Sequence, residues 1–96
     1  MRSKFSAKVT QELVNLLFAE FEIWEKLNDG RLTIEAIPQK VVPSKNYPSC
    51  VSQILQHRLP NGKHIATTHR IFNTAEKTAP HWDACDFHLG DVVLYR

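Results

Sequence analysis

The segment HWDACDFH (residues 81–88) gathers the side chains of this sequence that are best suited to chemistry. Its eight positions hold two histidines, two aspartates and one cysteine. If the segment begins as an extended strand, His81, Asp83 and Cys85 point to the same side, because strand side chains alternate. All three residue types bind zinc, and His88 could supply a fourth ligand. The spacing matches no structural zinc pattern, however, and a second pair of ligands is missing. We therefore predict no metal and no cofactor.

Acid–base catalysis is a second interpretation of the histidines. Metal-free cleavage of RNA needs a base for the 2′-hydroxyl, an acid for the leaving 5′-oxygen and a cation for the phosphate. Histidine suits the first two roles because its pKa lies near neutrality, and arginine suits the third because its guanidinium is bidentate. On this hypothesis His64 or His81 acts as base or acid, and Asp83 belongs to the same site. Arg70 and Arg58 hold the phosphate. Small bacterial ribonuclease toxins share a helix-then-sheet plan, which is an analogy at the level of the fold alone.

Binding without catalysis is a simpler interpretation of the same region, because it needs no acid or base. One face of a predicted hairpin carries Arg58, Lys63, His64 and Arg70, which could contact an RNA backbone or an acidic protein surface. Residues 31–80 hold seven basic and two acidic side chains, a net charge of +5. This charge is far weaker than the basic stripe of a dedicated DNA-binding protein. We predict a small binding module that acts on a protein or RNA partner, with a toxin-type ribonuclease as the alternative. A toxin–antitoxin or phage-related context would suit either function.

The polar segment also has a purely structural interpretation. Its aromatic residues would pack in the core, and its aspartates would cap turns or pair with residues elsewhere. The candidate partners are His69, Arg70 and Arg96. The neighbours of His81 distinguish the interpretations. If His81 lies beside His64, the two complete a proton-transfer site. If it meets His69 or Arg96 in the interior, the segment is a structural clasp.

Residues 5–28 have the periodicity of one long helix. Their apolar side chains recur on one stripe of a 3.6-residue period, Ser6 can cap the start, and residues 28–30 (NDG) can end the helix. The stripe comprises Val9, Leu13, Leu16, Leu17, Phe21, Trp24 and Leu27. Phe18 lies off this stripe. A dimer contact through Phe18 is a minor alternative to packing of the helix on a sheet.

Strand patterns follow the helix. Residues 31–37 alternate in polarity, prolines interrupt residues 38–48, and the sequence LPNG marks a hairpin between two longer runs. We predict a three-residue loop, Pro60–Gly62, that pairs Leu59 with Lys63. This register places His57 and His69 on an apolar face and His64 and Arg70 together on a polar face. A last strand would begin near residue 92.

The length and composition of the chain limit the possible folds and locations. Ninety-six residues predict a single small domain, residues 1–96, of the α+β class: one N-terminal amphipathic helix packed on a four-stranded, mainly antiparallel sheet. The opposite face of the sheet would be partly open and polar. Two widely spaced cysteines predict reduced thiols and a cytoplasmic location. No apolar run approaches the ~20 residues that cross a bilayer. A domain this small also makes a homodimer possible.

Overall fold

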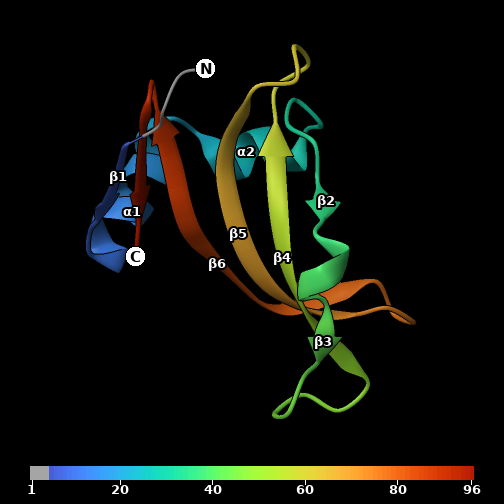
Figure 1. Cartoon of the computed structure of the whole chain (residues 1–96). Helices are drawn as coiled ribbons and strands as arrows, with labels where there is room; N and C mark the ends of the chain where they lie inside the picture. Colours follow the sequence, from blue (N-terminus) through green and yellow to red (C-terminus); the bar gives the residue numbers. More distant parts are fainter. Residues whose placement is uncertain (1–4) are drawn as a thin grey trace.

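The hairpin built around the Asn61–Gly62 turn forms the centre of a mixed sheet. The computed structural model describes residues 5–96. Within them, three long strands form an antiparallel meander (Figure 1): β4 (Cys50–Arg58), β5 (His64–Asn73) and β6 (Thr78–Leu89). Four shorter strands complete the sheet: β1 (Phe5–Lys8), β2 (Glu35–Ala36), β3 (Val42–Pro43) and β7 (Val92–Tyr95). The strand order is β1-β7-β6-β5-β4-β2, and β3 pairs separately with β4. Among the strands of the described residues, only the β1–β7 pair is parallel.

Two helices lie on one face of this sheet (Figure 1). They are α1 (Gln11–Glu20) and α2 (Ile23–Asn28), and a single 3₁₀ turn follows at η1 (Pro38–Lys40). The Thr10 hydroxyl caps α1 by accepting a hydrogen bond from the Leu13 amide at 3.1 Å. The helices are separated at Glu22, whose φ of 53° is left-handed. None of the helices in residues 5–96 is long and apolar enough to cross a membrane.

The core lies between the helices and the middle of the sheet. Its buried members are Val14, Phe18, Ile23, Leu27, Leu32, Ala66, Ala84 and Phe87. Each helix contributes an i, i+4 pair, the geometry expected when a short helix packs one face on a sheet.

The predicted helix over residues 5–28 is wrong in its extent and its apolar face. Its first residues form β1, so Ser6 is a strand residue and Thr10 is the cap. Phe18 is fully buried, whereas Leu16 is 65% exposed. A dimer contact through Phe18 is therefore excluded. The single periodic stripe already fails within α1, whose buried side chains are Val14 and Phe18, and the left-handed Glu22 then separates α1 from α2.

The α+β class and the mainly antiparallel sheet are confirmed, with two helices and seven strands among the described residues instead of one and four. The expected single domain covers residues 1–96, of which residues 1–4 lie outside the described part. The predicted strand over residues 31–37 is reduced to the two residues of β2. The last strand begins at residue 92, as expected.

The predicted hairpin loop is correct, but the register beyond it is wrong. The Leu59 amide donates to the Lys63 carbonyl at 2.9 Å, as a three-residue loop requires. Arg58 pairs with His64, but His57 then pairs with Ala66, so Ile65 is an extra residue in β5. Such a bulge exchanges the faces of all following side chains. Odd-numbered residues of β4 consequently lie opposite even-numbered residues of β5.

This bulge determines which side chains face the helices. Ala66, Ala84 and Phe87 belong to the helix-covered face because they pack in the core. The residues that alternate with them, including His69 and Asp86, lie on the other face. We call this second face the open face.

Candidate functional site: two polar clusters on the open face

The open face of β6 carries two carboxylate–imidazole pairs. Asp83 lies two residues after His81, and His88 lies two residues after Asp86, so the members of each pair share a face. The three-residue step from Asp83 to Asp86 would put the two pairs on opposite faces of a regular strand. The register shift between Thr67 and Thr68 leaves Cys85 as an extra residue in β6 and returns both pairs to the open face.

The first group is the distal cluster: Ser52, His69, His81 and Asp83. The Ser52 hydroxyl lies 2.6 Å from His69 Nε2. His69 pairs with Asp83 across β5 and β6, and Asp83 forms an ion pair with His81 Nε2. The two imidazole rings lie 6.4 Å apart between centroids, with an angle of 65° between their planes. Each ring thus has one side-chain partner that fixes its orientation.

The distal cluster is accessible to solvent. The side chains of His81 and Asp83 are 46% and 43% exposed. Partial burial lowers the pKa of His69, and the positive charge of Arg96 and the neighbouring His81 lower it further. His69 is therefore a neutral imidazole near pH 7, which is the form that accepts a proton. Arg96 is close enough to affect this equilibrium, and its Nε donates to the Ala84 carbonyl at 3.0 Å.

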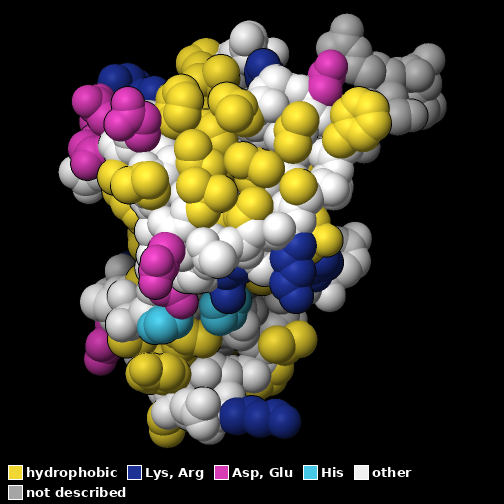
Figure 2. Space-filling view, turned by 90° about the vertical axis from the view of Figure 1, so that its left-hand side faces the viewer, with side chains coloured by type: hydrophobic (Ala, Val, Ile, Leu, Met, Phe, Trp, Pro, Cys, Tyr) yellow, Lys and Arg dark blue, Asp and Glu magenta, His cyan; other side chains and the backbone are white. Residues whose placement is uncertain are grey.

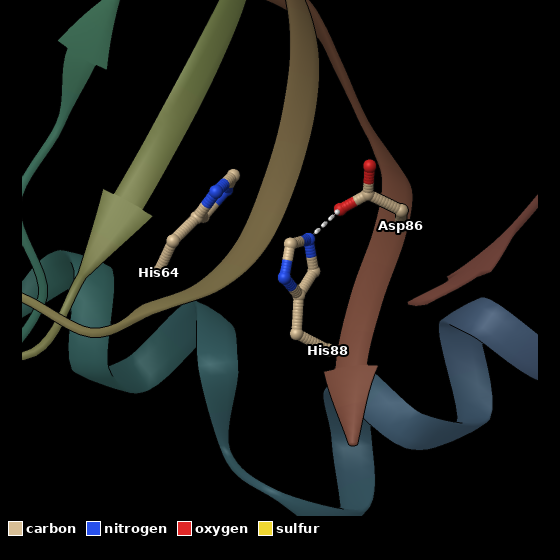
Figure 3. Close-up of side chains that lie close together, drawn as sticks. All are labelled: His64, Asp86 and His88. Atoms are coloured by element: carbon tan, nitrogen blue, oxygen red, sulfur yellow. Dashed lines mark ion pairs between the residues drawn. The ribbon is translucent and has the colours of Figure 1, made fainter. Parts of the chain in front are cut away.

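The second group is the hairpin cluster: His64, Asp86 and His88. Figure 3 shows His64 on β5 facing the other two side chains from across the sheet. His88 Nε2 lies 3.2 Å from Asp86 Oδ1, and the rings of His64 and His88 lie 4.2 Å apart between centroids. Burial lowers the pKa of His64, and the adjacent His88 lowers it further.

The structure does not bring His64 and His81 together. His64 pairs with Arg58 beside the hairpin loop, whereas His81 pairs with Ile71, seven residues further along β5. At about 3.3 Å per strand residue, this separation is roughly 23 Å. The two side chains cannot act on the same bond, so the predicted set of His64, His81, Arg70 and Asp83 does not form one site.

Arg70 lies on the opposite face of the sheet from both clusters. Its Nε donates to Gln53 Oε1 at 2.7 Å, and its guanidinium lies 4.0 Å from the centre of the Phe72 ring and 5.2 Å from that of Trp82. Burial lowers the pKa of Arg70. The bulge at Ile65 is the physical reason, since it exchanges the faces of the residues that follow His64.

The predicted basic face is therefore divided. Arg58 and Lys63 remain near the hairpin loop with His64, but Arg58 is engaged by the Gly62 carbonyl at 3.1 Å and by Glu35 at 3.8 Å. Lys63 is exposed.

His81 lies near the residues that the structural interpretation predicted as its neighbours, but it does so at the surface instead of in the interior. It lies beside His69, which was assigned to an apolar face, and Arg96 is near the same pair. The sequence prediction placed His69 on the apolar face by the wrong register, and it did not consider Ser52. The signal that could have found the arrangement is the pair of motifs HxD and DxH. Their odd separation requires a bulge if both are to share a face.

Comparison with known proteins adds no functional assignment. No protein-family model matches the chain, and neither the curated proteins nor the solved structures contain a match.

The metal ligands considered from sequence are also divided between the clusters. His81 and Asp83 belong to the distal cluster and His88 to the hairpin cluster, while Cys85 is the bulged residue between them. Arg96 Nη2 donates to Cys85 Sγ at 3.3 Å. Within residues 5–96, the hairpin cluster is the group of three candidate ligands whose donor atoms all lie within 4.8 Å of one another.

Proposed function

We propose that the domain binds RNA on its open face and cleaves it without a metal ion through the distal cluster. One observation carries this proposal: two oriented imidazoles, His69 and His81, lie 6.4 Å apart on an accessible surface. A phosphodiester needs an acid and a base on either side of its phosphorus. At 6.4 Å between centroids the two rings are close to edge contact, so both can reach oxygens of one phosphodiester that lies across them on the open face.

The partners of the two rings support distinct roles. Because a carboxylate only accepts hydrogen bonds, Asp83 fixes a proton on His81 Nε2 and orients the ring. His81 then serves as the acid, through Nδ1. Ser52 orients His69 through Nε2 and leaves its Nδ1 for substrate. The neutral His69 then serves as the base.

The cleavage step balances with these two groups alone. His69 takes the proton of the 2′-hydroxyl as the 2′-oxygen attacks phosphorus and the bond to the 5′-oxygen breaks. His81 gives its proton to that leaving oxygen. The products are a 2′,3′-cyclic phosphate and a free 5′-hydroxyl. Arg96 can supply the cation for the phosphate, since its charge already acts on His69.

The test is incubation of RNA with the protein in EDTA, followed by analysis of the cleaved ends. We expect His69→Gln and His81→Gln each to lower the cleavage rate by about 10²-fold or more. His64→Gln changes a histidine of the same strand outside the distal cluster and should retain the rate. Intact RNA with the unaltered protein would refute cleavage, and a salt-sensitive mobility shift would then leave RNA binding alone.

Binding of a protein partner, including a second copy of the chain, is a second candidate function. Figure 2, viewed from the side on which β1 and α1 lie, shows a broad hydrophobic area. Phe5 of β1 and Leu16 of α1 are 70% and 65% exposed. Apolar side chains at such positions are typical of interaction surfaces when they form a patch. We expect Leu16→Lys to reduce self-association in sedimentation velocity. Glu12→Lys, on the same helix, is the control for added charge.

A further inference from the structure

The hairpin cluster has the donor set of a transition-metal site. It supplies two imidazoles and one carboxylate, and their candidate ligand atoms all lie within 4.8 Å of one another. Zinc bonds of about 2.0–2.2 Å in a tetrahedral arrangement separate ligand atoms by roughly 3.3–3.6 Å. The distance from His88 Nε2 to Asp86 Oδ1 is 3.2 Å, which is close to the lower end of this range. Side-chain adjustment within the 4.8 Å limit would bring the three ligand atoms to these separations.

The backbone determines which nitrogen of His64 is available to an ion. His64 Nε2 lies 2.8 Å from the Ala66 carbonyl and 3.0 Å from Thr67 Oγ1. A carbonyl oxygen only accepts, so Nε2 carries the proton and Nδ1 carries the lone pair. A metal-binding histidine characteristically donates its other nitrogen to a carbonyl or carboxylate in this way, which orients the ring.

Asp86 supplies an independent observation. Its Oδ1 is buried and accepts no hydrogen bond from the described residues, because the 3.2 Å contact with His88 lacks hydrogen-bond alignment. The side chains of His88 and Asp86 are only 8% and 21% exposed. A buried carboxylate oxygen without a hydrogen bond is unfavourable, and such atoms usually have a water or an ion as partner.

We propose that His64, Asp86 and His88 bind one divalent ion of the zinc class. Two imidazoles favour Zn²⁺, Co²⁺ or Ni²⁺ over Mg²⁺ and Ca²⁺, which prefer all-oxygen sites. Three protein ligands leave the fourth tetrahedral position open to water, the arrangement of exchangeable zinc sites. The site joins β5 to β6 at the hairpin end of the sheet. It does not depend on the proposed RNA cleavage, which uses the other cluster.

The test is calorimetric titration of untagged, EDTA-treated and dialysed protein with ZnCl₂, together with Co²⁺ absorption spectra and thermal melts. We expect one equivalent of Zn²⁺ to bind, a tetrahedral Co²⁺ spectrum, and a higher Tm with zinc than without it. MgCl₂ should produce no binding heat. Absence of zinc binding by the unaltered protein would overturn the proposal, and this result requires no variant to fold.

Variants assign the ligands. Asp86→Asn preserves the shape of the side chain and should weaken zinc binding at least tenfold, as should His64→Gln. The matched control is His81→Gln, because His81 and Asp83 form the other histidine–aspartate pair of β6, and no third candidate ligand among residues 5–96 lies within 4.8 Å of both. This variant should bind zinc like the unaltered protein. An equal loss in all three variants, or no loss in Asp86→Asn and His64→Gln, would contradict the assigned site.

Discussion

At the level of single residues, a buried network of hydrogen bonds connects the strands at the centre of the sheet. His57 and Thr68 are both fully buried. His57 Nδ1 donates to the Thr33 carbonyl at 2.9 Å, so its Nε2 accepts from the Thr68 hydroxyl at 2.7 Å. The same hydroxyl accepts from Trp82 Nε1 at 2.8 Å. Each polar side-chain atom of His57, Thr68 and Trp82 in this hydrogen-bond network has a partner. The network therefore accounts for a histidine in the core without any catalytic role.

Replacement of Thr68 tests how much this hydrogen-bond network contributes to stability. Thr68→Val keeps the shape of the side chain but leaves His57 Nε2 and Trp82 Nε1 without a partner. We expect a loss of about 2–4 kcal/mol in the free energy of unfolding, measured by urea denaturation. Thr78→Val makes the same change at an exposed strand position and should stay within about 0.5 kcal/mol. Equal effects of the two changes would contradict the argument.

The histidines also predict a pH dependence of stability. Burial lowers the pKa of His57, with a further decrease from Arg70, while the Thr33 carbonyl and Asp86 oppose the shift. Above the ordinary value of 6.5 the folded and unfolded states are both neutral at this residue. Below it the unfolded state binds a proton that the folded state does not, so stability falls on acidification. The pKa values of His64 and His69 are lowered as well and act in the same direction.

Urea denaturation at intervals between pH 7.5 and pH 5 measures this effect. We expect the free energy of unfolding to decrease below about pH 6.5, by up to ~1.4 kcal/mol per pH unit for each such histidine. His57→Gln should give a shallower decrease, whatever its absolute stability. A slope unchanged by this substitution would show that His57 is not responsible.

At the level of elements, the turns were predictable from sequence and the bulges were not. The Pro60–Gly62 loop follows from local preferences, because Gly62 has a φ of 88° that few other residues adopt. The extra residues Ile65 and Cys85 are placed instead by packing of the strands around the core. Ile65 packs against the core, which turns His64 toward the open face. The candidate site was mispredicted because each bulge moves polar side chains between faces.

The N-terminal elements show the same limit. Residues 5–8 have a sequence compatible with a helix, and their strand conformation depends on pairing with β7 at the far end of the chain. No local pattern contains that partner. The end of the second helix near Asn28 was predicted correctly, because Gly30 follows it with a φ of 84°.

The turn between β5 and β6 offers an element-scale prediction. Lys77 has a φ of 60°, and its amide donates to the Asn73 carbonyl at 2.8 Å. The Asn73 side chain accepts from the amides of Ala75 and Glu76, so the turn is held independently of the Lys77 side chain. Lys77→Gly removes the left-handed strain and should raise the free energy of unfolding by about 0.5–1 kcal/mol.

Glu76→Gly is the matched control for this turn. Glu76 has no positive φ among the described residues, so glycine there adds only unfolded-state entropy and should lower stability. Thermal and urea denaturation of both variants give the comparison. A destabilisation by Lys77→Gly similar to that of Glu76→Gly would show that the turn carries no relievable strain.

At the level of the whole molecule, the first and last strands, β1 and β7, pair with each other at one edge of the sheet. Phe5–Lys8 pairs in parallel with Val92–Tyr95, so contacts between the most distant segments form one side of the structure. β7 is paired on both edges, with β1 and with β6, whereas β1 is paired on one edge and all four of its residues are exposed. The two terminal strands therefore contribute unequally.

This inequality predicts different outcomes for two truncations. Removal of residues 91–96 deletes β7, leaves β1 without its partner and exposes the edge of β6 along Asp86–Leu89. We expect this form to lose cooperative thermal unfolding. Removal of residues 1–8, with a new initiator methionine, exposes only the edge of β7 and should retain a cooperative transition at a lower Tm. If both forms unfold alike by circular dichroism, pairing of β1 with β7 does not contribute separately to stability. Stability then rests on the meander of β4, β5 and β6 alone.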